Sequence, residues 1–221
     1  MKVGVLLAAG ASTRMGSPKP LVQSGRESFL VRGVRVLWSA CDVVIVVLGS
    51  KAAQVRRATE RELEKRVSIG WFHHALLNPR RRMNRALEVH FVVNRSWRRG
   101  MYGSVRVGLA AARPLKPSSL VVLPVDHPEV GARTISDLAE VMEQALQACR
   151  SARERAAFSY ALIPRWRRDR GHPLVLTPSL AWAIASDTAA ADLSDAVRRH
   201  ARLVGYLDVE DPGITVNRNT P

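Results

Sequence analysis

Short apolar runs alternate with longer segments of mixed character along most of the chain. An apolar run of about four to eight residues between polar segments predicts a strand buried on both faces, as in a parallel sheet. The strands predicted in this way are residues 3–7, 43–48, 87–93 and 118–125. Each is followed by a segment with helical spacing or mixed charge, and the predicted helices are residues 27–40, 52–66, 105–112 and 131–150. The alternation predicts an α/β fold, a doubly wound, mostly parallel and Rossmann-like sheet flanked by helices.

The last third of the chain continues this pattern less regularly. Strands are predicted at 158–164 and 203–209, and a helix within 186–199 with Asp192 or Ser194 as its N-cap. The 221 residues have the length of one ordinary domain, so we expect a single domain over 1–221. Residues 68–85 contain adjacent histidines and a run of arginines, and we expect a basic excursion there, as a lid, a partner surface or a loop.

Composition narrows the class of protein. No apolar run reaches the ~18 residues that a membrane helix needs, so no membrane association is expected. Two cysteines suggest no disulfide framework, and we expect a cytoplasmic protein. The formal net charge of +15 would suit a polyanionic partner such as nucleic acid. The arginines are instead spread along the chain without a nucleic-acid-binding motif, so we prefer solvated faces that also attract phosphorylated substrates.

The loop after the first strand has the chemistry of a phosphate site. Small residues surround Gly10, so backbone N–H groups can approach an anion there. Arg14 adds a planar guanidinium fork, and Lys19 adds a second positive charge. The spacing of Gly10, Gly16 and Lys19 fits neither the P-loop nor the G-x-G-x-x-G dinucleotide motif. The residues therefore indicate another kind of phosphate cradle, and the alternative is a glycine-rich turn without a ligand.

Residues 7–21, LAAGASTRMGSPKPL, resemble the signature L-A-[AG]-G-x-S-x-R-M-G-x-x-K-x-L of the molybdenum-cofactor-type nucleotidyltransferases, the MobA-like NTP transferase domain family. Every fixed position is present. The resemblance implies an enzyme in which Arg14 holds the leaving phosphates and Lys19 stabilises charge at the α-phosphate, so both are catalytic. The residues that it places around the nucleoside triphosphate are Leu7, Ala8, Ala9, Gly10, Ser12, Arg14 and Lys19.

A second string, N-x-x-W-x-x-G-M-x-x-S-x-x-x-G-L, is similar to another signature of the same family. The resemblance implies that this segment lines the base and ribose of the nucleotide. The residues concerned are Asn94, Trp97, Gly100, Met101 and Ser104. From the residues alone, the segment also fits an Asn-capped turn with a buried Trp97. Ser104 is expected to be the N-cap of the helix that follows.

Asp126 directly follows the strand predicted at 118–125, in the triplet Asp126-His127-Pro128. A carboxylate at the carboxyl end of a strand, beside a phosphate cradle, is well placed for Mg²⁺. The alternative is a cap of the turn, which is common for Asp-x-Pro. The resemblance implies that Asp126 is a catalytic metal ligand and that His127 is a neighbour. It also implies a closing strand near the end of the chain, in which Asn219 is the second metal ligand.

Arg170, Gly171 and His172 resemble the R-G-H-P element of the molybdenum-cofactor subgroup, which faces the acceptor substrate. The resemblance thus implies a Mg²⁺-dependent transfer of a nucleoside monophosphate from a triphosphate to a phosphorylated acceptor such as molybdopterin, with release of pyrophosphate. The form L-A-A-G favours CTP. The alternatives are a sugar- or other phosphate-directed nucleotidyltransferase that uses GTP or another triphosphate, and a nucleotide-binding module without catalysis.

Overall fold

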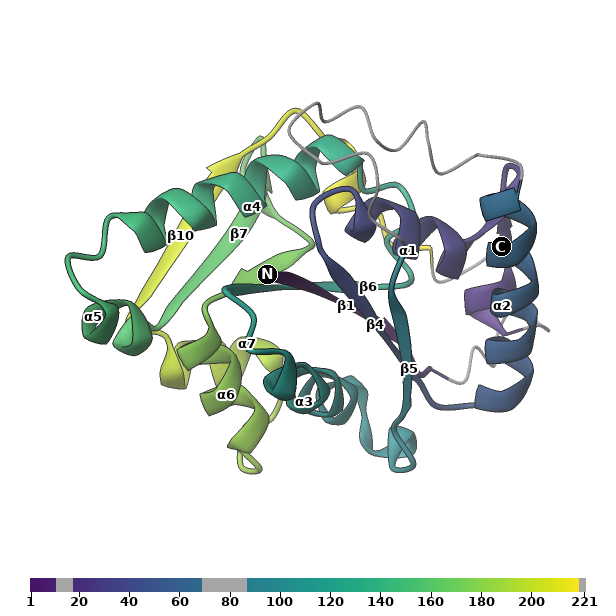
Figure 1. Ribbon diagram of the computed structural model, residues 1–221, viewed down its shortest axis with the longest axis horizontal. Coiled ribbons are helices and arrows are strands. Elements are labelled where there is room, and N and C mark those ends of the chain that lie inside the picture. Colours follow the sequence, from purple (N-terminus) through teal and green to yellow (C-terminus); the bar gives the residue numbers. More distant parts are fainter. Residues whose placement is uncertain (11–17, 69–86, 219–221) are drawn as a thin grey trace.

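A mixed sheet of eight strands lies between two layers of helices in the computed structural model, which describes residues 1–10, 18–68 and 87–218 (Figure 1). The strand order is β10-β7-β9-β6-β1-β4-β5, and β8 pairs with β7. The strands are β1 (Lys2–Ala8), β4 (Val43–Leu48), β5 (Val89–Val93), β6 (Ser119–Pro124), β7 (Tyr160–Trp166), β8 (Asp169–Arg170), β9 (Leu174–Leu176) and β10 (Leu203–Asp208). Two further short strands, β2 (Gln23–Ser24) and β3 (Glu27–Ser28), form a separate antiparallel pair.

The central strands are parallel, as the sequence predicts. β1 lies between β4 and β6, with Leu7 opposite Val47 on one side and Pro124 on the other. β10 is parallel to β7, whereas β9 is antiparallel to both β6 and β7. The carboxyl ends of β1, β4, β5 and β6 therefore lie at one edge of the sheet. Ligands of open α/β sheets bind outside this kind of edge.

The helices divide between the two faces of the sheet (Figure 1). One face is covered by α1 (Phe29–Trp38), α2 (Ala52–Ser68) and α4 (Ala132–Gln147), and the other by α3 (Met101–Ala112), α6 (Pro178–Ser186) and α7 (Leu193–His200). Successive residues of β1 point to opposite faces, so Leu6 belongs to the first apolar core and Val5 to the second. This two-sided burial explains why the central strands are apolar throughout.

Shorter helical turns complete the chain. They are the 3₁₀ turns η1 (Lys19–Leu21), η3 (Trp97–Arg99), η4 (Arg113–Leu115) and η5 (Pro212–Ile214), and the short helix α5 (Ala152–Ala157). Residues 68–85, the predicted basic excursion, lie outside the described part of the chain apart from Ser68, which ends α2. Within the described ranges, none of the helices combines the length and the apolar character that a membrane crossing requires.

Three local predictions need correction. Helix α3 begins at Met101 with Gly100 as its N-cap, so Ser104 lies inside the helix and does not cap it. Helix α6 is absent from the prediction because Pro178 and the short apolar stretch after it resemble a turn followed by a strand. No closing strand forms over 211–218, where η5 occupies the chain instead. Asp192, by contrast, is confirmed as an N-cap, since its carboxylate accepts a bond of 2.8 Å from the backbone N–H of Asp195.

Candidate active site

The loops after β1 and β6 meet at the carboxyl edge of the sheet. The backbone N–H of Val125 donates to the carbonyl of Leu7 at 3.0 Å, which extends the β1–β6 pairing beyond the strand ends. Beside it, the ammonium nitrogen of Lys19 lies 3.6 Å from Oδ2 of Asp126. These side chains are 13% and 22% exposed. An ion pair so largely withdrawn from water is screened less than one on the surface, so the two charges control each other's position.

Of the residues predicted to surround the nucleotide, Leu7, Ala8 and Ala9 are buried in the structure, and Gly10 is exposed. The buried side chains leave the backbone as the part of this segment that a ligand could reach. The carbonyl of Ala9 already accepts a hydrogen bond of 3.1 Å from the N–H of Ser50, the second residue after β4. Ser12 and Arg14 lie outside the described residues.

Gly49 is a residue of this edge that the sequence analysis did not single out. A Cβ atom at Gly49 would collide with the carbonyl oxygen of Ala9 and would lie 2.7 Å from Cβ of Trp97. Three loops, after β1, β4 and β5, therefore converge on a point where no side chain fits. The signal in the sequence was a Gly-Ser pair directly after an apolar strand. This convergence brings Trp97 next to the predicted phosphate cradle.

Asn94 connects the loop of Trp97 to helix α3. Its side chain is buried, with Nδ2 donating to the hydroxyl of Ser104 at 3.0 Å and Oδ1 accepting from the N–H of Ser96 at 3.0 Å. Asn94 and Ser104 thus fix the loop from within. Trp97 is half-buried with the guanidinium of Arg98 at 4.5 Å from its ring centre, and Met101 is 57% exposed. Trp97 and Met101 are accordingly better placed than Asn94 to touch a ligand.

Two histidines lie beside Asp126. The rings of His127 and His172 are 4.5 Å apart between centres, and the Nδ1 atoms of both are buried without a hydrogen-bond partner among the described residues. Burial lowers the pKa of His172 to about 4, helped by His127 and opposed by Asp126. Burial also lowers the pKa of His127, although Asp126 opposes this effect. Both imidazoles are therefore neutral at pH 7, and each keeps an unused nitrogen at the edge of the site.

The end of the chain holds these loops together. The N–H of His172 donates to the carbonyl of Ile214 at 2.9 Å, and the N–H of Arg218 donates to the carbonyl of Asp126 at 2.8 Å. A side chain at Gly171 would collide with the same Ile214 carbonyl. Residues 214–218 therefore join the loops of His172 and Asp126. Asn219, the predicted second metal ligand, lies outside the described residues.

Arg170 takes a different direction from His172. It is exposed, and its guanidinium lies 5.2 Å from the ring centre of Tyr206 on β10. No contact joins Arg170 to Asp126 among the described residues. The structure thus brings together Lys19, Asp126, Gly171 and His172, and it sets Arg170 against the edge strand.

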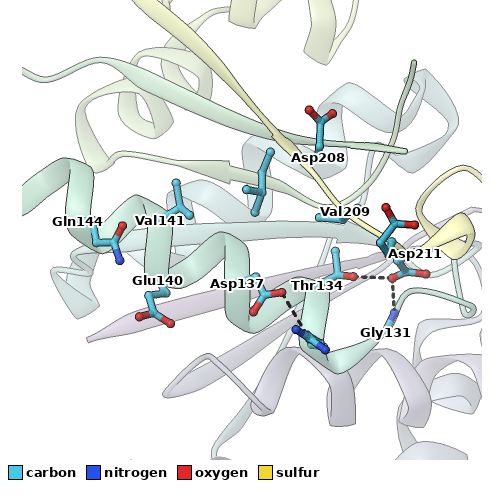
Figure 2. Close-up of a pocket in the computed structure, with 12 residues that line it drawn as sticks. Gly131, Thr134, Asp137, Glu140, Val141, Gln144, Asp208, Val209 and Asp211 are labelled. Carbon is cyan, nitrogen blue, oxygen red and sulfur yellow. Dashed lines mark hydrogen bonds and ion pairs between the residues drawn. The ribbon is translucent and has the colours of Figure 1, made fainter. Parts of the chain in front are cut away.

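A pocket of about 610 Å³ opens between α4 and the end of β10 (Figure 2). None of the residues predicted for the active site lines it. The carboxylate of Asp211 accepts from the N–H of Gly131 at 2.9 Å, from the hydroxyl of Thr134 at 2.6 Å and from the N–H of Gly213 at 2.9 Å. Asp211 therefore anchors η5 to the start of α4. Residues 214–218, which follow in the chain, are the ones that contact the loops of His172 and Asp126.

The comparisons with known proteins agree with this geometry. The model of the MobA-like NTP transferase domain matches residues 4–203, almost the whole chain. The chain belongs to the MobA-like NTP transferase domain family. This membership confirms the resemblance in the two signatures and makes the protein a nucleotidyltransferase. No curated protein sequence matches the chain.

Solved structures share the fold of this MobA-like domain. Rv0371c from Mycobacterium tuberculosis H37Rv is 23% identical, with a TM-score of 0.67 over 99% of this chain and 93% of that one. A nucleotidyl transferase from Methanothermobacter is 21% identical, with a TM-score of 0.63 over 100% and 92%. Molybdopterin-guanine dinucleotide biosynthesis protein A from Archaeoglobus fulgidus is 20% identical, with a TM-score of 0.55 over 100% and 93%. These likenesses confirm the predicted nucleotidyltransferase fold.

The donor chemistry of the MobA-like site suits a hard divalent cation. In residues 1–10, 18–68 and 87–218, no three His, Cys, Asp or Glu side chains come together as a ligand cluster. A single carboxylate at the entrance, Asp126, remains partly exposed. Mg²⁺ in nucleotide sites is usually bound through one or two carboxylates together with substrate phosphates and water. One partly exposed carboxylate beside the predicted phosphate cradle fits that mode better than a closed protein cage.

Proposed function

We propose that this MobA-like enzyme transfers a nucleoside monophosphate from CTP to a phosphorylated acceptor such as molybdopterin and releases pyrophosphate, with Mg²⁺ as its metal. The observation that carries the proposal is the pair Lys19 and Asp126 at the carboxyl edge of the sheet, with His172 beside it. Cation, carboxylate and neutral imidazole are the groups that a transfer between two phosphates needs. They come from three separate loops that the sheet and residues 214–218 hold together.

The reaction that we propose is an in-line displacement at the α-phosphorus. A phosphate oxygen of the acceptor forms the new bond to phosphorus while the bond to the pyrophosphate oxygen breaks, so no covalent intermediate with the enzyme is required. Positioning and charge stabilisation then supply most of the catalysis. Lys19 would stabilise charge at the α-phosphate, and Arg14 would hold the leaving phosphates. Asp126 and Asn219 would hold the metal, which neutralises phosphate charge when it is bound.

His172 fits an orienting role on the acceptor side. Since its pKa lies at about 4, it is neutral at pH 7 and does not attract an anion by its charge. A neutral imidazole can still donate or accept one hydrogen bond to the acceptor. The close approach of Gly171 to Ile214 fixes the backbone of His172, so the ring is held in place before the acceptor binds.

The choice of CTP rests on the sequence of the predicted cradle. The L-A-A-G form of the cradle favours CTP, whereas the Archaeoglobus fulgidus relative is named for a guanine dinucleotide. We assign recognition of the base to Trp97 and Met101. The Cβ of Trp97 approaches Gly49 together with the carbonyl of Ala9, and Met101 begins α3 four residues later. One structure of Rv0371c is described as a complex with manganese (21% identical, TM-score 0.58, 94% and 88% covered), so Mn²⁺ belongs in the same assay as Mg²⁺.

Pyrophosphate release tests the proposal. CTP, GTP, ATP and UTP are supplied in turn with molybdopterin and with Mg²⁺ or Mn²⁺, and Asp126→Ala is run alongside. Release with CTP that needs the acceptor and disappears in the variant supports the proposal. Release with another triphosphate transfers the specificity to that nucleotide and overturns the CTP assignment. Tight nucleotide binding without release, across a panel of phosphorylated acceptors that includes sugar phosphates, identifies a non-catalytic module.

A further inference from the structure

Strand β10 is an edge of the sheet with unused backbone groups. It stands at the end of the strand order, and β7 is its neighbour (Figure 1). The N–H groups of Leu203 and Val209 donate to carbonyls of Ser159 and Arg165, on the β7 side. Because backbone groups alternate in direction along a strand, those of Val204, Tyr206 and Asp208 point away from β7. Within the described residues, the sheet supplies no partner for this outer side.

Apolar side chains are exposed along the same strand. Leu203 is 54% exposed and Tyr206 is 41% exposed, and both are large hydrophobic residues. Natural edge strands are usually protected by short length, by charged side chains (lysine above all), by proline or by a bulge, and the charged residue of β10 is Asp208 at its end. The strand Leu203–Asp208 contains neither proline nor lysine, and its pairing with β7 runs without interruption from Leu203 to Asp208. The edge therefore has the features of a strand that pairs with another one.

The sequence around β10 is complementary to itself. If two copies pair in antiparallel fashion about a two-fold axis at Tyr206, each Arg202 faces Glu210 of the other copy. Both residues are exposed, and no ion pair joins either of them to another described residue. Tyr206 then faces Tyr206 of the second copy, and Val204 faces Asp208. In this register Tyr206 with Tyr206, and Val204 with Asp208, are the facing residues whose backbone groups point outward, so each of these pairs can exchange two hydrogen bonds. Arg202 faces Glu210 through its side chain alone, because its backbone N–H already donates to the carbonyl of Ser159 at 2.9 Å.

We propose that this protein forms a two-fold symmetric dimer in which β10 pairs antiparallel with β10 of a second copy, with Tyr206 on the axis. The interface is isologous, as a two-fold requires. A continuous sheet then crosses both subunits. Ion pairs between Arg202 and Glu210 close the two ends of the strand pair, and the central tyrosines lie against each other with Arg165 and Arg170 beside their rings.

Charges of opposite sign stand at the two ends of β10, with Arg202 before the strand and Asp208 and Glu210 at its end. The chain carries a formal net charge of +15, so two copies repel each other over most orientations. The pocket at the end of β10 is acidic and includes Asp137, Glu140, Asp208 and Glu210 (Figure 2). The acidic residues at the end of β10 lower the positive potential there. In the antiparallel pair, this end of one copy lies beside Arg202 of the other copy. Electrostatic complementarity of this kind fixes orientation and register.

The expected dimer is weak and depends on concentration. A stable specific interface usually buries about 1,600 Å² in total, and one pair of short strands with its flanking side chains falls at the low end of the range. We therefore expect a monomer–dimer equilibrium in sedimentation velocity over a concentration series. Hydrogen exchange gives the register: the amides of Val204, Tyr206 and Asp208 gain protection as concentration rises. Those of Leu203 and Val209, already bonded to β7, do not.

Charge reversal tests the pairing without touching the active site. Arg202→Glu places glutamate against Glu210 at both ends of the strand pair, and Glu210→Arg places arginine against Arg202, so each variant is expected to lower dimer affinity at least tenfold. The double variant restores opposite charges and is expected to recover the dimer. Arg61→Glu, an exposed arginine on α2 beyond the other end of the sheet, is the matched control and keeps the wild-type equilibrium.

Two results would overturn the proposal. One is a wild-type protein that stays monomeric throughout the concentration series. The other is a dimer that withstands both single charge reversals, because such a dimer uses another surface. Since Arg202 and Glu210 are exposed, thermal unfolding of each variant is expected to match the wild type, which separates a lost interface from a lost fold.

Discussion

The ammonium of Lys19 lies 3.6 Å from the carboxylate of Asp126, although the two residues follow different strands. The register of β1 and β6 produces this proximity, since Leu7 stands opposite Pro124 and the two loops leave the sheet side by side. The two opposite charges stabilise each other. A nucleotide and its metal would separate them, with the lysine turning to phosphate and the carboxylate to the cation.

The first prediction concerns this pair. Lys19→Gln and Asp126→Asn each remove one charge and keep the approximate shape of the side chain. Loss of one group that stabilises transition-state charge commonly costs about 10²–10³ in kcat, and we expect losses of that order for pyrophosphate release. Each variant also leaves the other charge of a largely buried pair without its partner, so a lower melting temperature is expected and activity is measured well below it. Full turnover by Asp126→Asn would remove Asp126 from the catalytic site.

The second prediction concerns the point where three loops meet. Gly49→Ala places a Cβ against the Ala9 carbonyl and Cβ of Trp97, neither of which can move without shifting its loop. We expect weaker nucleotide binding and a lower melting temperature, measured by calorimetry. Gly103→Ala is the matched control, because its new Cβ would lie 3.5 Å from Nδ2 of Asn94, which is ordinary van der Waals contact. Equal behaviour of the two variants would contradict the close approach.

The third prediction separates structure from recognition at Asn94. Its side chain is buried and bonded to Ser104 and to the N–H of Ser96, so Asn94→Ala leaves partners unsatisfied and should lower the free energy of unfolding by about 1–3 kcal/mol. Ser104→Ala should cost less, and the double variant should cost less than the sum because the two residues share a bond. A double-mutant cycle in urea measures this coupling. Strict additivity would show that the bond does not contribute.

The fourth prediction concerns pH. The hydrogen bond from His200, backed by the N–H groups of Ala189 and Ala190, lowers the pKa of Asp187 to about 2. A carboxyl group with a lowered folded-state pKa stabilises the protein above its unfolded value of about 3.9 and loses that contribution as pH falls through about 2. Asp187→Asn should therefore unfold at a lower temperature than the wild type at pH 7. The difference should shrink as the pH is lowered from 4 towards 2, and a constant difference over that range would refute the assignment.

Much of the fold could be predicted from the sequence, because strands that are buried on both faces consist of uninterrupted apolar residues. The apolar runs of β1, β4 and β6 have no other good explanation, and the alternation with helices follows from parallel pairing. Helix α6 escaped prediction because nine residues starting with proline carry too little periodicity. The stretch 211–218 was mistaken for a strand because its local sequence does not show that Asp211 bonds to Gly131 and Thr134.

The proximity of two predicted site residues could be inferred from the sequence, whereas the packing around them could not. The sequence indicates Lys19 and Asp126 through their position after strands, and the structure brings them together. The ring contact of His127 with His172 and the steric role of Gly49 depend on segments far apart in the chain, so no local pattern reveals them. The roles assigned to Ser12, Arg14 and Asn219 stay predictions, since these residues lie outside the described ranges.

The hydrogen bonds of Asp211 connect the start of α4 to the segment that contacts the loops of His172 and Asp126. Its carboxylate ties η5 to the first turn of α4, and the next residues bond to His172 and Asp126. The attachments at Asp211, Ile214 and Arg218 thus follow one another along one short segment of chain. Cutting the chain before Asp211 would release the loops of His172 and Asp126 together. Residues 211–218, although remote from the central strands, therefore set the distance between the two loops to which the proposal assigns the acceptor and the metal.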